Sequence, residues 1–169
     1  MSRESTVDST GAALVATVPV AAFFEEQLRH VKGPAAGSAF RLEPWQQSFA
    51  DEFVRLDGEG QRIFKRALLG VARGNGKSPM AAGFALRELF AADDSPDVFL
   101  AAASRDQARI VFEYARGFVE TGPLASLLQV GRNEIRNPAN GGVLRTISAD
   151  GYVQHGLNPS GVVIDELHA

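Results

Sequence analysis

The residues best suited to chemistry stand together in one glycine-rich stretch, which reads Val71-Ala72-Arg73-Gly74-Asn75-Gly76-Lys77-Ser78. Phosphate-binding loops follow the pattern G-x-x-x-x-G-K-[ST]. The stretch matches this pattern at Gly76, Lys77 and Ser78. It departs at the first position, where Val71 stands in place of glycine and Gly70 comes one residue early. The remaining matches predict a phosphate-binding loop.

A loop with Val71 in place of the first glycine can still bind phosphate. Glycines let the backbone take positive φ angles and turn successive N–H groups toward phosphate oxygens. A helix that begins at Lys77 adds its positive end. Lys77 can then reach the β- and γ-phosphates, and Ser78 can ligate Mg²⁺. The alternative is an ordinary glycine turn between a strand and a helix, with a solvated lysine.

A second chemical feature is an apolar run that ends in two carboxylates, Val162-Val163-Ile164-Asp165-Glu166. In P-loop ATPases this arrangement is the Walker B element. Asp165 would hold Mg²⁺ through water, and Glu166 would polarise the attacking water. The alternative is a strand followed by a solvated turn. The run follows the glycine loop after a further strand, a helix and a hairpin, an order that fits the additional-strand class of P-loop ATPases.

Two other segments carry weaker signals. The ring of Trp45 can stack on adenine, and the amide of Gln46 can pair with its edge. Alternatively, Trp45 is a core residue of an N-terminal helix. The run Ala101-Ala102-Ala103-Ser104-Arg105-Asp106-Gln107-Ala108 suits a ligand-facing loop at the carboxyl edge of a sheet, with Arg105 and Arg109 near phosphates. The alternative there is a capped helix with solvated arginines.

The elements that must position these residues alternate between strand and helix. Apolar runs predict buried strands at residues 67–72, 98–103 and 161–164. Apolar periodicity predicts helices at residues 20–31, 44–56, 77–90 and 105–120, and turn signals predict a hairpin at 134–147. Residues 1–18 have no clear period and indicate a loose tail. This alternation is typical of an α/β fold with a mainly parallel sheet.

Composition is ordinary for a globular protein, with 45% apolar and 22% charged residues. The sequence has no cysteine, which excludes disulfide scaffolds and cysteine-ligated zinc. The three histidines, His30, His155 and His168, form no spaced cluster for a metal. The net charge of −3 argues against a chain that coats nucleic acid by bulk charge. No apolar run is long enough to span a membrane.

Taken together, four segments of the sequence resemble the tailed-phage terminase large subunit. They are Pro44-Trp45-Gln46, the loop R-G-N-G-K-S, the run A-S-R-D-Q-A, and H-G-L-N-P-S-G-V-V-I-D-E-L-H. The resemblance covers residues 40–169. It implies the three-layer sandwich of P-loop NTPases with a mainly parallel sheet. We expect this ATPase domain at residues 39–169, after an N-terminal tail and short helix at residues 1–38.

The resemblance also implies a role for each candidate residue. Arg73, Gly74, Asn75, Gly76, Lys77 and Ser78 would form Walker A, with Arg73 sensing or stabilising the γ-phosphate. Trp45 and Gln46 would match the adenine-binding segment. Glu166 would be the catalytic glutamate, and Asp165 would hold the metal together with Ser78. The implied cofactors are ATP and Mg²⁺.

The function that the resemblance implies is ATP hydrolysis that powers DNA packaging into the procapsid. The implied partners are double-stranded DNA, the terminase small subunit, the portal protein and further copies in a ring. The implied location is the cytoplasm of the bacterial host, with no membrane association.

The chain departs from the family in length, because Ala169 comes three residues after Glu166. We therefore expect a fold truncated after the Walker B strand, without a coupling motif or nuclease domain. By itself such a chain is expected to bind nucleotide weakly, to show no DNA-stimulated ATPase and no DNA cleavage, and to aggregate.

Two other functions stay open at this point. Asp165-Glu166-Leu167-His168 has the form found in DExH-type helicases and translocases. Against this alternative, helicase P-loops usually keep the first glycine. The other alternative is an inactive remnant that folds poorly and binds nothing.

Overall fold

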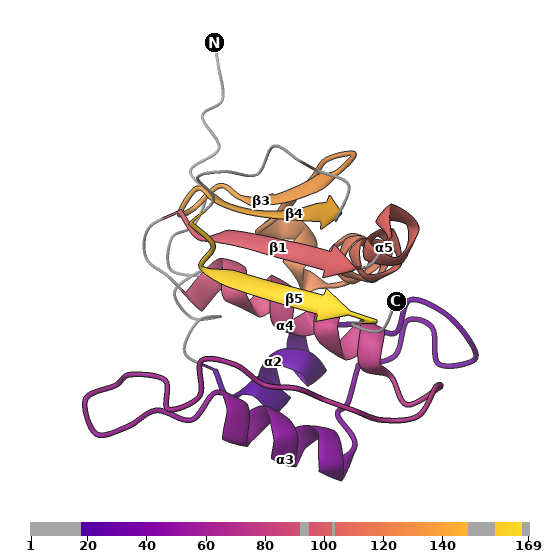
Figure 1. The fold of residues 1–169 in the computed structure, drawn as a ribbon. Helices are drawn as coiled ribbons and strands as arrows, with labels where there is room; N and C mark the ends of the chain where they lie inside the picture. Colours follow the sequence, from indigo (N-terminus) through magenta and orange to yellow (C-terminus); the bar gives the residue numbers. More distant parts are fainter. Residues whose placement is uncertain (1–17, 92–94, 103, 149–157, 167–169) are drawn as a thin grey trace.

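Five strands form one sheet in the order β2-β3-β4-β1-β5 in the computed structural model (Figure 1). The structure describes residues 18–91, 95–102, 104–148 and 158–166. The strands are β1 (Asp97–Ala102), β2 (Gln129–Val130), β3 (Glu134–Asn137), β4 (Gly142–Ser148) and β5 (Gly161–Asp165). β1 pairs in parallel with both β4 and β5, while β2, β3 and β4 form antiparallel pairs. The predicted α/β class with a mainly parallel central sheet is confirmed.

The helices begin close to the residues that the sequence predicts. They are α2 (Val20–Gln27), α3 (Pro44–Phe53), α4 (Lys77–Ala91) and α5 (Arg105–Thr121). A short 3-10 helix that was not predicted, η1 (Pro123–Ser126), follows α5. α5 is capped by Ser104, whose hydroxyl accepts a hydrogen bond from the Gln107 N–H at 3.3 Å. α2 is shorter than predicted because Leu28 adopts an extended backbone and leads into a hairpin.

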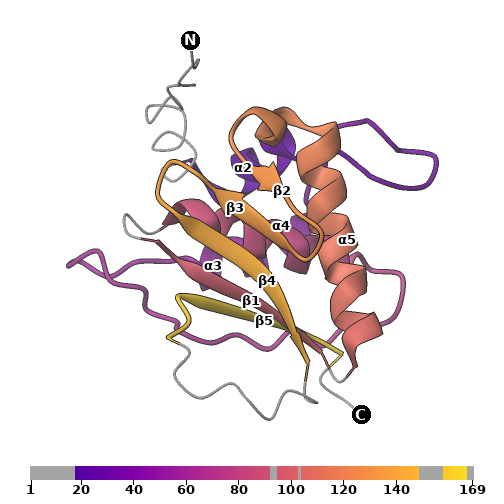
Figure 2. The same ribbon diagram turned by 90° about the horizontal axis from the view of Figure 1, so that it is seen from above.

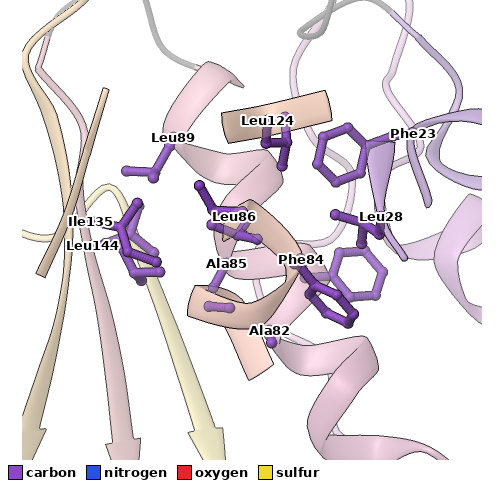
Figure 3. Close-up of a cluster of buried hydrophobic side chains, with 14 of the residues drawn as sticks. Phe23, Leu28, Ala82, Phe84, Ala85, Leu86, Leu89, Leu124, Ile135 and Leu144 are labelled. Atoms are coloured by element: carbon purple, nitrogen blue, oxygen red, sulfur yellow. The ribbon is translucent and has the colours of Figure 1, made fainter. Parts of the chain in front are cut away.

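The hydrophobic core is built around α4, which lies between the sheet and the N-terminal helix α2 (Figure 3). Ile135 and Leu144 reach α4 from the strands, while Phe23 and Leu28 reach it from the opposite side. α5 packs beside α4 against the same sheet (Figure 2). The helix α2, which the sequence places in the N-terminal segment, therefore shares one core with α4 and α5.

The predicted strand at residues 67–72 is wrong. These residues run in an extended path toward the glycine loop but belong to no strand, and Leu68 is 83% exposed. A short apolar run shows only that a segment can be buried, whereas a strand also needs a neighbour that hydrogen-bonds to it. Among the described residues, the parallel neighbours of β1 are β4 and β5 instead.

The other predicted strands are confirmed, with small shifts of their ends. The hairpin predicted at 134–147 is formed by β3 and β4, and its second arm belongs to the central sheet. The two-residue strand β2 was not predicted, because it is too short to show a period. Most of the expected tail (residues 1–17), Ala103, His155, Leu167 and His168 lie outside the described residues.

Candidate nucleotide-binding site

The predicted phosphate loop lies at the end of the molecule toward which β1 and β5 point (Figure 1). α4 begins there at Lys77, directly after the loop. The carboxyl ends of parallel strands are where α/β proteins usually place their ligands. The fold thus brings the amino end of α4 and the acidic end of β5 to the same place.

The glycine loop has the backbone conformation that phosphate binding requires. Gly74 and Gly76 have φ angles of +83° and +71°, which favour glycine. The Gly76 carbonyl accepts a hydrogen bond from the Met80 N–H at 3.0 Å, so the helix starts at the end of the loop. The N–H groups of the first helical turn are therefore available to an anion.

Lys77 and Arg73 occupy different environments in this loop. The half-buried Lys77 folds back, and its Nζ donates to the Val71 carbonyl oxygen at 2.7 Å. Arg73 is exposed to solvent. The lysine of the site is thus held against the loop itself, while the arginine lies at the surface.

Ser78 and Asp165 meet, although they are far apart in the sequence. The Ser78 hydroxyl donates to Asp165 Oδ2 at 2.6 Å. Asp165 is only 9% exposed, so its carboxylate does not belong to a solvated turn. A hydroxyl and a carboxylate are oxygen ligands of the kind that Mg²⁺ prefers. The pair fits a metal-binding role next to the phosphate loop.

Glu166 follows directly after β5 and has an unusual backbone. Its φ angle is +54°, in the left-handed region that residues other than glycine rarely adopt. Such a conformation costs about 1–3 kcal/mol and is concentrated at functional sites. This left-handed residue follows directly after the buried Asp165.

Trp45 and Gln46 lie in the first turn of α3, and both line a cavity of about 570 Å³ beside the glycine loop. Trp45 is 38% exposed, which excludes the alternative of a buried core residue. Gln46 is buried, and its Nε2 donates to the Asn75 carbonyl oxygen at 3.1 Å. Its Oε1 accepts a hydrogen bond from the Glu43 N–H at 2.9 Å. Gln46 therefore holds α3 against the loop.

Comparison with known proteins identifies the family. Residues 44–169 match the family model described as terminase large subunit, ATPase domain. The chain belongs to this family. It is 30% identical over 153 residues to the terminase large subunit of Enterobacteria phage HK97. That alignment covers 87% of this chain and 29% of the relative, so the chain spans less than a third of the relative's length.

The fold agrees with this assignment. The crystal structure of the HK97 bacteriophage large terminase is similar with a TM-score of 0.74 and 29% identity. The likeness covers 88% of this chain and 30% of the solved one. Membership of the terminase family favours this assignment over a DExH-type helicase or an inactive remnant.

The contact between Gln46 and Asn75 was missed by sequence reasoning. The two residues lie 29 positions apart, and no periodicity or motif relates them. The string Pro44-Trp45-Gln46 predicted only that the start of this helix contacts a ligand. In this terminase domain Gln46 also lies close to Gly76, because a Cβ added at Gly76 would be 3.1 Å from Gln46 Nε2. The loop and α3 are therefore closely fitted.

Arg109 of the middle motif faces solvent on α5. Arg109 is exposed and pairs with Glu113 at 3.5 Å along the surface of α5. The side chain of Arg105 lies outside the described part of the structure. In the part of the chain that the structure describes, no helix is both long and apolar enough to cross a membrane.

Proposed function

We propose that this chain is the part of a terminase that binds ATP with Mg²⁺, and that ATP hydrolysis in the full-length protein powers the packaging of double-stranded DNA into a procapsid. The observation that carries the proposal is the hydrogen bond of 2.6 Å between Ser78 and Asp165. It joins the end of the phosphate loop to the end of the acidic strand. A glycine turn with a solvated lysine would not require this contact.

Different residues would bind the different parts of the nucleotide. Backbone N–H groups of residues 74–78 and the ammonium of Lys77 bind the phosphates, since charge-assisted hydrogen bonds to phosphate are strong. Arg73 is exposed and stabilises the γ-phosphate. Trp45, on the wall of the neighbouring cavity, contacts the adenine.

The metal and the water are assigned to the two carboxylates at the end of β5. Ser78 and Asp165 would hold Mg²⁺, which neutralises charge that develops on the phosphates. Glu166 would orient and polarise the attacking water. The left-handed backbone of Glu166 supports this role, because such conformations are concentrated at functional sites.

The wider setting rests on the family rather than on contacts. Terminase small subunit, portal protein and a ring of further copies are proposed partners, together with double-stranded DNA. The bacterial host cytoplasm is the proposed location. Because the chain spans only 29% of its HK97 relative, these partners are proposed for a longer protein as well as for this chain.

Substitution of the two carboxylates tests the proposal, because their roles differ. Glu166→Gln keeps the shape but loses the charge, so Mg²⁺·ATP binding is retained while single-turnover hydrolysis falls by about 10²–10⁴-fold. Asp165→Asn weakens binding only when Mg²⁺ is present. Equilibrium binding with and without Mg²⁺, followed by quenched-flow hydrolysis, measures both. Normal hydrolysis in both variants would refute the assignment.

A further inference from the structure

The cavity beside the phosphate loop has a wall that the family assignment does not include. The family match begins at residue 44, but His30 and Lys32 also line this cavity of about 570 Å³. They belong to a hairpin at residues 28–40, which we call the 28–40 hairpin. Two backbone hydrogen bonds join its arms. The Phe40 N–H donates to the Leu28 carbonyl oxygen at 3.0 Å, and the His30 N–H donates to the Ser38 carbonyl oxygen at 2.9 Å.

The 28–40 hairpin is fixed to α5 by close packing. At Gly117 of α5, an added Cβ would lie 2.5 Å from Val31 Cγ1, so only a glycine admits the hairpin at this distance. One helical turn earlier, the ammonium of Lys32 lies over the ring of Tyr114, 5.1 Å from its centroid. Tyr114 also lines the cavity. The hairpin and α5 thus form one wall.

Aromatic contacts support the same wall from behind. The ring of His30 stacks on Phe40 with centroids 4.6 Å apart. Phe40 in turn meets Phe118 of α5 edge to face at 5.6 Å. These contacts tie the lining residue His30 to the core through Phe40 and Phe118.

The chemistry of the cavity suits a nucleoside. Residues 74–76, where the phosphates bind in the proposed function, line part of the cavity, so a nucleotide held there would place its ribose and base in the same cavity. Rings accept a planar base by stacking. The amide of Gln46, which also lines the cavity, is held in place by one hydrogen bond from Glu43 and one to Asn75.

We infer that the 28–40 hairpin and Tyr114 form the nucleoside-binding wall of this ATPase site. The inference rests on the proposed function, since it uses the phosphate loop to orient the nucleotide. It assigns a ligand-binding role to a hairpin that precedes the family match and to Tyr114 within it, and it separates the site into a phosphate part and a nucleoside part.

Two ligands distinguish these parts in the 169-residue chain. Trp45 is its one tryptophan and lines the cavity, so its fluorescence reports Mg²⁺·ATP binding. Inorganic tripolyphosphate with Mg²⁺ occupies the phosphate loop alone, and its affinity follows from competition against ATP. Far-ultraviolet circular dichroism and thermal unfolding establish that each variant is folded.

Gly117→Ala is the decisive variant, because its new methyl group displaces Val31 and with it the hairpin. We expect ATP to bind about tenfold or more weakly, as for loss of a stacked base, while tripolyphosphate affinity is unchanged. Val31→Ala added to Gly117→Ala removes the two methyl groups that would lie 2.5 and 2.8 Å from the new Cβ, and should restore most of the ATP affinity. Tyr114→Leu, which keeps an apolar side chain but removes the ring and its contact with Lys32, should give the same selective loss.

Three results would overturn the inference. Equal weakening of ATP and tripolyphosphate in Gly117→Ala would place the effect in the loop or the fold. Unchanged ATP affinity in both Gly117→Ala and Tyr114→Leu would show that the wall does not contact the nucleoside. Failure of the wild-type chain to bind either ligand would refute the proposed function itself, and the inference with it.

Discussion

The core around α4 and the segment that leads into the phosphate loop (residues 62–72) both contain apolar side chains. These side chains are buried in the core but largely exposed in the segment. Phe23, Phe24 and Leu86 are completely buried. Ile63, Phe64 and Leu68, in contrast, are 44%, 40% and 83% exposed. The segment is fixed at its start by the ion pair between Arg62 and Glu88 at 2.6 Å. Between that pair and the loop it belongs to no strand.

This difference shows which elements hold the site. Gln46 reaches the loop from α3, Ser78 lies on α4, and Asp165 lies on β5. All three elements contribute to the main core or pack against it. These contacts therefore link the loop to α3 and the start of α4 to β5.

The largest loss in the free energy of unfolding is expected from Phe24→Ala. The ring is fully buried and meets Phe40 and Phe84 at centroid distances of 5.7 Å, so its removal leaves a cavity among them. Such a change costs about 3–5 kcal/mol, a large part of the stability of a small domain. Denaturant unfolding followed by circular dichroism measures it. A loss below about 1 kcal/mol would contradict the proposed packing of α2.

The smallest loss in the free energy of unfolding is expected from Leu68→Ala. This variant shortens an apolar side chain in the exposed segment, as Phe24→Ala does in the core. With 83% of its surface in solvent, Leu68 has little burial to lose. The free energy of unfolding should stay within about 0.5 kcal/mol of the wild-type value in the same denaturant experiment. A loss similar to that of Phe24→Ala would show that the segment is buried in solution, and would remove the contrast between the two regions.

Local signals explain what the sequence could predict. The ends of α4 and α5 were predicted to within one residue. This was possible because caps and apolar periods are signals that lie within the helix sequence itself. The positive φ angles of Gly74 and Gly76 follow from the motif in the same way. The strand expected at residues 67–72 failed because pairing depends on a neighbour, which an apolar run does not specify.

Contacts between distant segments were beyond such signals. The pairing of Ser78 with Asp165 was expected only because two motifs occurred in the right order. Nothing in the sequence indicates that Val31 packs on Gly117 or that Gln46 bonds to Asn75. Both contacts depend on how α2 and α3 are placed against α4 and α5, which is decided by the core as a whole.

The central claim, that the loop before α4 binds the phosphates of ATP, is tested most directly by titrating Trp45 fluorescence with Mg²⁺·ATP in the wild-type chain and in Lys77→Ala. Lys77 supplies a charged donor, and loss of a hydrogen bond from a charged group costs about 1.5–3 kcal/mol, or about 10- to 150-fold in affinity. We predict a saturable change in the wild type and a weakening of that size in Lys77→Ala. Saturation of both proteins at the same ATP concentration would contradict the claim.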